Sequence, residues 1–351
     1  MQPFVTQYNI TFTGQTTYST GNAPNSVVAA DVNGDGKPDI IVGNAGSNNV
    51  GVLLNRGNGT FTNQTTYLTG ANPYELTAAD LNGDGKTDII VANQNSNNVG
   101  VLLNIGNGTL ANQTTYLTGN RPISVVAADV NDDGKPDIIV VNYGSNNVGV
   151  LLNIGNGTLA NQTTYLTGAG PYEAAAVDVN GDNKIDIIVA NSNSNNVGVL
   201  LNIGNGTFAN QATYSVGLWP GSVVATDVNG DGKPDIIVAV TGANTASVLL
   251  NTGNGTFSAQ TTYLTGNWPD EVVVVDVNGD GKADIIVANY NSNNVGVLLN
   301  IGNGTFADQT TYSAGSGASC VAVVDVNGDG KPDIIVTNAN SNNVCVLLAY
   351  Y

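Results

Sequence analysis

The sequence predicts an all-β fold: a seven-bladed β-propeller of four-stranded antiparallel blades, closed by the N-terminal strand. Three observations support this prediction. A 49-residue unit recurs seven times, the apolar runs within each unit are short and separated by turn residues, and the two chain ends supply complementary parts of one unit. Repeats of 20–50 residues are typical of solenoids, propellers and arrays. We expect one domain over residues 1–351.

Each repeat contains four predicted strands, as the first copy shows. Residues 26–30 and 39–42 flank an acidic loop, residues 50–54 follow a polar turn, and residues 60–67 follow a Gly-Asn-Gly turn. Short apolar runs bounded by turn residues indicate strands, and no segment has a helical period. Residues 40–42 and 52–54 are apolar on both faces, as in sheets that are covered on both sides.

The chain termini favour a closed ring over an open solenoid. The chain ends after the third predicted strand of the seventh unit, at residues 347–351. It begins with residues 8–18, which match the fourth strand of the other units. We therefore expect residues 4–18 to supply the outer strand of the last blade, which removes the open sheet edge.

Composition excludes several classes of function. The chain has 27 acidic and 9 basic residues, no His, and a net charge of -18. An acidic surface repels phosphate backbones, so we expect no nucleic-acid partner. No apolar run approaches the ~18 residues that a membrane span needs. Mechanisms that use an imidazole base are excluded.

Most of the acidic residues lie in seven nearly identical loops between the first and second strands of each unit. Oxygen ligands at loop positions 1, 3, 5 and 9, with a backbone carbonyl at position 7, suit calcium at ~2.3–2.6 Å. Position 12 is Val42 in the first copy, where an EF-hand has Glu, and no helices flank the loop. We expect up to seven structural Ca²⁺ ions; a calcium-sensing role and metal-free loops are the alternatives. The predicted ligands are Asp31, Asn33, Asp35, Lys37 and Asp39; Asp80, Asn82, Asp84, Lys86 and Asp88; Asp129, Asn131, Asp133, Lys135 and Asp137; Asp178, Asn180, Asp182, Lys184 and Asp186; Asp227, Asn229, Asp231, Lys233 and Asp235; Asp276, Asn278, Asp280, Lys282 and Asp284; Asp325, Asn327, Asp329, Lys331 and Asp333.

The opposite face of the ring is the one on which the copies differ. Antiparallel strands alternate ends, so the turn between strands two and three and the connection between blades lie opposite the acidic loops. Aromatic side chains beside polar ones suit a sugar or peptide ligand. The alternative is that they cap the grooves between blades. The candidate ligand-binding residues on this face are Tyr74, Tyr143, Tyr172, Trp219, Trp268 and Tyr290.

Four further acidic residues lie near these aromatic positions. Glu75, Glu173 and Glu271 share one register of the repeat, where other copies have Ser. Because they belong to alternate blades, we expect them to lie too far apart for paired-carboxylate glycosidase chemistry. Asp270 and Glu271 are adjacent, and we expect them to be a solvated charge pair. No catalytic residue is predicted.

The two cysteines belong to the last unit. Cys320 lies on its first predicted strand and Cys345 on its third. One intervening strand separates them by roughly 9–10 Å, whereas a disulfide needs Cα atoms within ~7 Å. We therefore expect two free, buried thiols.

The repeat resembles the FG-GAP/VCBS repeat of integrin α subunits, some fungal lectins and many secreted bacterial proteins. Asp-Val-Asn-Gly-Asp-Gly-Lys-Pro-Asp-Ile-Ile-Val, Asn-Val-Gly-Val-Leu-Leu-Asn and Gly-Asn-Gly-Thr-Phe carry the resemblance, which covers nearly the whole chain. It implies calcium in the acidic loops, an extracellular setting with the secretory leader absent from this sequence, and adhesion or ligand binding. The chain departs from the integrin version at residues 42–44, where Val-Gly-Asn stands in place of Gly-Ala-Pro.

Together these features predict a non-catalytic, calcium-binding scaffold for extracellular ligand binding or adhesion, with a protein or carbohydrate ligand and a monomeric state. One alternative is a lectin with sugar pockets between the blades. A weaker alternative is a polysaccharide lyase or hydrolase on a propeller frame.

Overall fold

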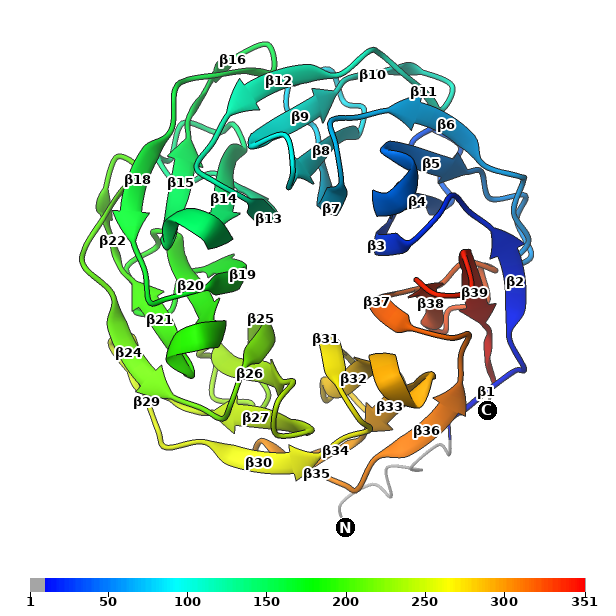
Figure 1. Ribbon diagram of the computed structural model, residues 1–351. Coiled ribbons are helices and arrows are strands. Elements are labelled where there is room, and N and C mark those ends of the chain that lie inside the picture. The colour runs from blue at the N-terminus through cyan, green and yellow to red at the C-terminus, as the bar shows by residue number, and fades with distance from the viewer. Residues whose placement is uncertain (1–9, 351) are drawn as a thin grey trace.

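The computed structural model describes residues 10–350, in which seven four-stranded antiparallel sheets form a ring around a central axis (Figure 1). Each sheet is one blade, and its strands follow one another from the axis to the rim. This arrangement confirms the predicted seven-bladed propeller. Among residues 10–350 no helix is long and apolar enough to cross a membrane.

The innermost strands surround the central axis and begin at the aromatic-bearing connections. They are β3 (Pro24–Ala30), β7 (Pro73–Ala79), β13 (Pro122–Ala128), β19 (Pro171–Val177), β25 (Pro220–Thr226), β31 (Pro269–Val275) and β37 (Ala318–Val324). The second strands follow the acidic loops, and every residue in them is buried. They are β4 (Asp39–Asn44), β8 (Asp88–Asn93), β14 (Asp137–Asn142), β20 (Asp186–Asn191), β26 (Asp235–Val240), β32 (Asp284–Asn289) and β38 (Asp333–Asn338).

The third strands continue each blade outward and lie beyond a tight turn that is a short 3₁₀ helix in four copies. They are β5 (Asn49–Leu53), β9 (Asn98–Leu102), β15 (Asn147–Leu151), β21 (Asn196–Leu200), β27 (Thr245–Leu249), β33 (Asn294–Leu298) and β39 (Asn343–Leu347). The 3₁₀ turns are η1 (Ala45–Ser47), η2 (Tyr143–Ser145), η3 (Ser192–Ser194) and η4 (Tyr290–Ser292).

The predicted fourth strand is divided into two parts, which corrects the single continuous strand expected from the sequence. The rim strands are β6 (Thr65–Leu68), β12 (Thr114–Leu117), β18 (Thr163–Leu166), β24 (Ala212–Ser215), β30 (Thr261–Leu264), β36 (Thr310–Ser313) and β2 (Thr16–Ser19). Before most of them a small bulged hairpin folds back on itself. These hairpins are β10–β11 (Asn104–Gly106, Thr109–Leu110), β16–β17 (Asn153–Gly155, Thr158–Leu159), β22–β23 (Asn202–Gly204, Thr207–Phe208), β28–β29 (Asn251–Gly253, Thr256–Phe257) and β34–β35 (Asn300–Gly302, Thr305–Phe306). In the first blade a single bridge between Asn55 and Phe61 replaces the hairpin.

The N-terminal segment closes the ring, as predicted. Strand β2 pairs with β39 and forms the rim of the last blade. A separate pair, β1 (Thr11–Phe12) with β40 (Ala349–Tyr350), takes the place of the small hairpin in that blade. Of the predicted residues 4–18, residues 4–9 lie outside the described residues.

Phe61, at the bridge of the first blade, connects that blade to its neighbour. Phe61 is 4% exposed and packs against Val326 and Ile335 of the last blade. Its ring meets Tyr18 of β2 edge-to-face, with the ring centroids 5.4 Å apart. Apolar packing between the blades therefore supplies the core, since each sheet buries both faces against its neighbours. Cys320 and Cys345 are free and buried, as expected.

Candidate functional site

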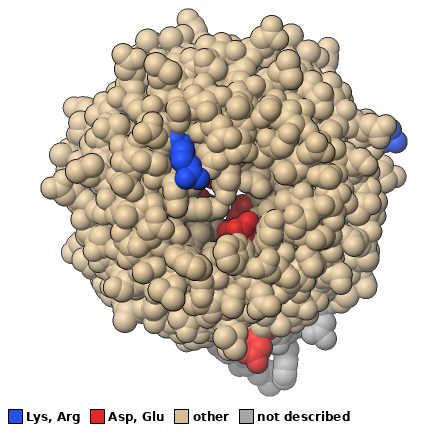
Figure 2. All heavy atoms as spheres, viewed as in Figure 1, with Lys and Arg blue, Asp and Glu red and all other residues tan. Residues whose placement is uncertain are grey.

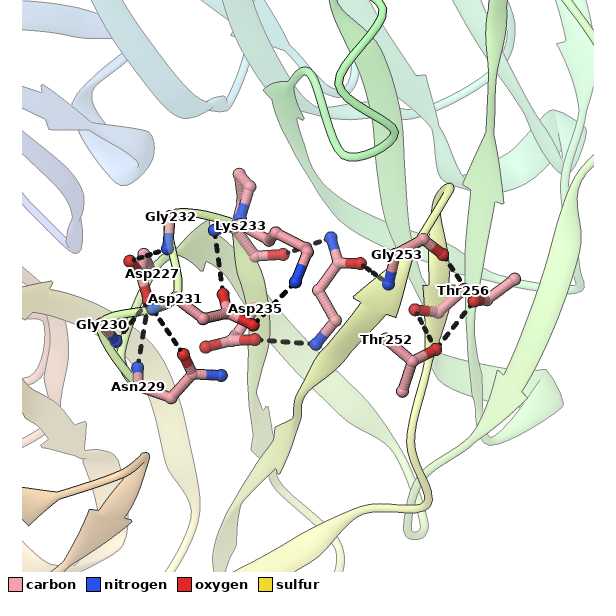
Figure 3. Close-up of polar contacts among 12 residues, drawn as sticks. Asp227, Asn229, Gly230, Asp231, Gly232, Lys233, Asp235, Thr252, Gly253 and Thr256 are labelled. Carbon is pink, nitrogen blue, oxygen red and sulfur yellow. Dashed lines mark hydrogen bonds and ion pairs between the residues drawn. The ribbon is translucent and has the colours of Figure 1, made fainter.

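The backbone of each acidic loop is folded around the carboxylate at its first position. In the fifth blade (Figure 3), Oδ1 of Asp227 accepts hydrogen bonds from the backbone N–H groups of Asn229 at 3.1 Å, Gly230 at 2.7 Å and Asp231 at 3.3 Å. Its Oδ2 accepts one from Gly232 at 2.7 Å. Gly230 and Gly232 have φ values of 82° and 80°, a conformation that glycine adopts without strain.

The lysine at the seventh loop position is paired with the carboxylate at the fifth. Lys233 Nζ lies 3.0 Å from Asp231 Oδ2, and this interaction lowers the pKa of Asp231. The same pair occurs in all seven loops at distances from 2.7 to 3.5 Å. The repeat pattern predicts only the lysine carbonyl as a calcium ligand, and it gives no sign of this ion pair.

The carboxylate at the ninth loop position is fully buried. Asp235 is 0% exposed, and it accepts backbone hydrogen bonds from Val228 at 3.1 Å and from Asn251 at 2.7 Å. The Asn251 side chain in turn donates to the carbonyl of Val179 in the preceding blade at 2.9 Å. This aspartate therefore joins its own loop, the following hairpin and the neighbouring blade.

The donor chemistry of these loops fits a hard cation, but the side chains do not converge on one point. Burial raises the pKa of Asp235, and the nearby carboxylates of Asp231 and Asp227 raise it further, so the three charges lie close enough to repel one another. All the predicted donors are oxygen atoms, which calcium prefers. Within residues 10–350, however, no group of three or more His, Cys, Asp or Glu side chains is arranged to hold a metal ion. The loop is instead closed by its lysine and its own amide groups.

The two tryptophans stand on the opposite face of the ring. Trp219 and Trp268 immediately precede β25 and β31, with φ values of 55° and 59°. Their side chains are 52% and 41% exposed, and their ring centroids lie 6.4 Å apart. The chain therefore presents two large aromatic side chains to solvent, side by side.

Three tyrosines lie beside the tryptophans. Tyr172 makes edge contacts with Tyr74 and Tyr143, with ring centroids 6.1 and 6.3 Å apart. The hydroxyl groups of Tyr74 and Tyr172 are hydrogen-bonded to each other, although their strands, β7 and β19, belong to alternate blades. Side chains from alternate blades therefore meet across the central axis.

Tyr143 and a further tyrosine, Tyr290, also bridge neighbouring blades. Tyr143 accepts a hydrogen bond from Asn193 at 3.4 Å, and Tyr290 donates one to Asn340 at 3.2 Å. Arg121 lies over the Tyr143 ring, with its guanidinium carbon 4.9 Å from the ring centroid. Through these contacts Tyr143 and Tyr290 cap the grooves between blades, which was the alternative expected from the sequence. The same side chains also form part of a cavity wall.

The aromatic residues line two cavities at one end of the axis. One cavity of about 260 Å³ lies among Tyr143, Tyr172, Trp219 and Trp268. Another of about 410 Å³ lies among Tyr74, Tyr172, Trp268 and Tyr290. We call these six aromatic residues and the space between them the mouth. The structure thus brings together all six candidate ligand-binding residues.

Below the mouth, acidic side chains line the central channel, and this finding corrects two expectations. Glu75, Glu173 and Glu271 line one cavity of about 40 Å³ together with Asp270. The three glutamates therefore lie close enough to interact, and Asp270 and Glu271 are half-buried rather than freely solvated. Figure 2 shows acidic atoms within the central opening of a face that carries little other charge. The expectation was wrong because the innermost strands lie close to the axis, where alternate blades meet.

The enclosure of these carboxyl groups changes their pKa values. Burial raises the pKa of Glu75 to about 8, with a further contribution from Glu271, and burial alone raises that of Asp270 to about 7. The pKa values of Glu173 and Glu271 are also raised well above the ordinary value, first by burial and then by the neighbouring glutamate. We call these four residues the acidic channel.

Glu173 also contacts the next blade along the ring. Glu173 accepts hydrogen bonds from the Ser222 hydroxyl at 3.1 Å and from the Val223 backbone N–H at 3.4 Å. The alternation of Glu and Ser at one register was visible in the sequence. In the fourth copy this alternation corresponds to a contact, because Glu173 reaches Ser222, the residue at the same position of the following copy.

Sequence comparison identifies the family to which this propeller belongs. The sequence model of the FG-GAP-like repeat matches residues 6–42, 31–91, 80–140, 129–189, 178–238, 227–287 and 276–336. The chain belongs to the FG-GAP-like repeat family. No curated protein matches this FG-GAP-like propeller in sequence.

Several solved propellers resemble the FG-GAP-like chain in structure. BBS1N, solved in complex with ARL6DN, is 12% identical with a TM-score of 0.68, over 97% of each chain. Virginiamycin B lyase from Staphylococcus aureus is 13% identical with a TM-score of 0.67, over 96% of this chain and 99% of the lyase. A lectin of Agrocybe aegerita that recognises non-reducing terminal N-acetylglucosamine is 25% identical with a TM-score of 0.58, over 82% of this chain and 80% of the lectin. The first two likenesses show the shared fold.

Proposed function

We propose that this FG-GAP-like propeller is a non-catalytic, extracellular binding scaffold whose ligand enters the mouth. One observation carries the proposal. The positions at which the repeats differ most converge on two adjoining cavities with aromatic walls. Concave, largely apolar sites with a few polar groups are the usual form of small-ligand sites.

A carbohydrate is the first ligand class to test. Aromatic faces beside polar groups stack on sugar rings, and the structurally similar Agrocybe aegerita lectin recognises a sugar. The mouth differs from the sugar pockets between blades that the sequence analysis considered, because it lies over the axis. A protein ligand that inserts one side chain into the mouth is the alternative occupant.

The test is a glycan-array screen of the protein in calcium, repeated with the double variant Trp219→Gly/Trp268→Gly. Glycine occupies the same position in other copies, at Gly170 and Gly317, so the variant retains a residue that the fold accepts there. We expect array signals of the parent protein to be lost in the variant. Signals that persist unchanged would place the ligand elsewhere and contradict the proposal.

We further propose that calcium stabilises the acidic loops. Their oxygen donors and mutual carboxylate repulsion support this proposal, and each bound ion would neutralise the net charge of a loop with three Asp and one Lys, which is every loop except the third, where Asp132 adds a charge. The predicted ligands of the fifth loop, for example, are Asp227, Asn229, Asp231, the Lys233 carbonyl and Asp235. Millimolar calcium should raise the Tm and a chelator should lower it. An identical Tm in calcium and in chelator would show that Lys233 and its counterparts alone close the loops.

A lyase or hydrolase is the second candidate. The acidic channel favours it, because carboxyl groups with raised pKa values can transfer protons near neutral pH. Any glycan identified by the array should therefore be incubated with the protein and analysed by mass spectrometry. Cleaved product would establish the enzyme, whereas intact glycan would favour the binding scaffold.

A further inference from the structure

The acidic channel carries negative charge that no basic side chain neutralises. Only five acidic residues lie outside the seven acidic loops, and the channel takes four of them, leaving Asp308. None of the nine basic residues lines the acidic channel. At the mouth, Arg121 lies over the outer Tyr143 ring and lines none of the cavities. The lysines lie in the loops of the opposite face, where each is paired with an aspartate.

Asp270 connects the mouth to the acidic channel. It lines both mouth cavities and the narrow cavity below them. Its carboxylate has no hydrogen bond or ion pair with any residue in the part of the chain that the structure describes, and burial alone raises its pKa to about 7. Asp270 is half-buried, and a carboxylate that loses part of its hydration without gaining a partner is less stable than a paired one. A ligand that donates a hydrogen bond or brings positive charge would remove that penalty.

The tryptophans above Asp270 occupy backbone positions that disfavour them. All seven residues at this position of the repeat have positive φ, and other copies place Gly170, Gly317 and Asn72 there. A left-handed conformation costs a bulky residue roughly 1–2 kcal/mol. Strain of this kind gathers at functional sites. The faces of Trp rings also attract cations more strongly than those of other aromatic side chains.

We propose that the mouth binds a ligand that carries a primary ammonium group on a slender aliphatic stem. The stem lies between Trp219 and Trp268, and the ammonium group meets Asp270. This inference rests on the proposed binding function of the mouth and specifies its ligand class. The cavity beyond Asp270, about 40 Å³ in volume, holds water-sized groups, which suits an ammonium better than a planar guanidinium.

The chain supplies its own reporter for the test. Trp219 and Trp268 are its only two tryptophans, so tryptophan emission, excited at the red edge where its 14 tyrosines do not absorb, reports on the mouth. The probe is cadaverine (1,5-diaminopentane), and the matched neutral probe is 1,5-pentanediol, which has the same stem. Titrations are run in calcium at about 0.15 M salt, where screening over ~8 Å suppresses attraction to distant surface charge. We expect a saturable change with cadaverine and none with the diol.

Two variants distinguish the effect of the acidic channel on binding from the effect of the overall negative charge of the protein. Asp270→Asn removes the charge beside the mouth, and Asn25 at the same position of the first copy shows that the register accepts Asn. Asp308→Asn removes one exposed charge outside the channel. We expect Asp270→Asn to weaken cadaverine binding at least tenfold and Asp308→Asn to leave it unchanged. Glu271→Ser, which copies Ser222, is a second channel variant and should also weaken binding.

A pH series adds a readout that simple stacking would not change. The groups that face Asp270 and its neighbours are Tyr74 and Glu75 on β7, Tyr172 and Glu173 on β19, Glu271 on β31 and Cys320 on β37. An ammonium favours the ionised carboxylates, so binding should release protons at pH 7. Affinity should rise between pH 6 and pH 8. Calorimetry in two buffers of different ionisation enthalpy measures the released protons.

The outcomes distinguish this inference from the proposed function. Equal binding of cadaverine and the diol, no binding of cadaverine, or undiminished affinity in Asp270→Asn would overturn the ammonium assignment. Neutral glycans bound by the parent protein and lost in Trp219→Gly/Trp268→Gly would still support the mouth as the binding site. The double variant lacks both tryptophans, so its cadaverine binding is measured by calorimetry. If it binds cadaverine and glycans as the parent does, both proposals fail.

Discussion

At the residue scale, the mouth depends on two tryptophans held in a conformation that favours glycine. Trp219 has a φ of 55°, and its neighbour Trp268 has a φ of 59°. The repeat itself provides the comparison, because Gly170 and Gly317 occupy the equivalent position without a side chain. The aromatic rings are therefore unnecessary for the connection to fold, and their presence is explained by what they contact.

The first prediction concerns Trp219→Gly. Relief of the left-handed strain offsets the greater flexibility of glycine in the unfolded chain, so the free energy of unfolding should stay the same or rise by up to about 1 kcal/mol. Chemical denaturation measures it. The control is Ala23→Gly, at the same position with a φ of 48° but no aromatic ring. A loss of more than about 2 kcal/mol in Trp219→Gly alone would show that the ring stabilises the fold.

At the element scale, the acidic loop contains carboxylates with different roles. Asp235 is buried and satisfies two backbone N–H groups, whereas Asp231 is more exposed and paired with Lys233. The sequence shows a uniform set of calcium ligands. In the structure Asp235 is a buried link between blades, whereas Asp231 is an outer carboxylate that can interact with a cation or with Lys233.

The second prediction compares two variants of this loop. Asp235→Ala leaves the N–H groups of Val228 and Asn251 without acceptors, so the free energy of unfolding should fall by about 2–5 kcal/mol even without calcium. Asp231→Ala should cost less than about 1 kcal/mol in chelator, yet reduce the gain in Tm on adding calcium. Urea denaturation with and without calcium measures both. Equal effects of the two variants in chelator would contradict the separate roles.

Sequence analysis predicted the elements better than it predicted the site. Turn residues and apolar runs located the strands, and antiparallel alternation placed the acidic loops and the aromatic residues on opposite faces. The meeting of Glu75, Glu173 and Glu271 was missed because it depends on the radius of the ring. It also depends on a register shift between Pro73 and Glu75 at the start of β7, which no local pattern reveals.

At the scale of the whole molecule, the closed ring creates both the acidic channel and the mouth. Four carboxyl groups are held near one another because seven inner strands surround a single axis. The same closure depends on β2, which pairs with the last blade far away in sequence. Stability, closure and ligand binding are therefore linked through the position of the innermost strands.

The third prediction concerns pH. The folded-state pKa of Glu75 is raised to about 8, above its value in the unfolded chain. The protonated form of Glu75 is therefore favoured by folding, and the stability that this group contributes is fully present at low pH and is lost as pH rises from about 4.5 through about 8. Without ligand, the Tm should be at least about 2 °C lower at pH 9 than at pH 6. Glu75→Ser should reduce this difference in Tm, whereas Asp308→Asn should leave it unchanged. A Tm that rises between pH 6 and pH 9 would contradict the burial of the Glu75 carboxyl group in the acidic channel.

The fourth prediction concerns closure. Deleting residues 1–19 removes β2 and the buried Phe12, which meets Tyr312 edge-to-face with ring centroids 4.9 Å apart. The free energy of unfolding should fall by at least about 3 kcal/mol, the cost typical of losing one buried Phe side chain. A synthetic peptide of residues 10–20 added in trans should restore part of the Tm. A truncated chain as stable as the parent would show that the ring does not need its N-terminal strand.

The mouth over the acidic channel is the ligand site that we propose. Its most direct test is a crystal structure of the protein in calcium, soaked with the tightest ligand found by the array or by the amine titrations. Ligand density should lie between Trp219 and Trp268, with the polar end of the ligand beside Asp270. Density confined to the acidic loops or to the outer grooves between blades, with the mouth empty, would contradict it.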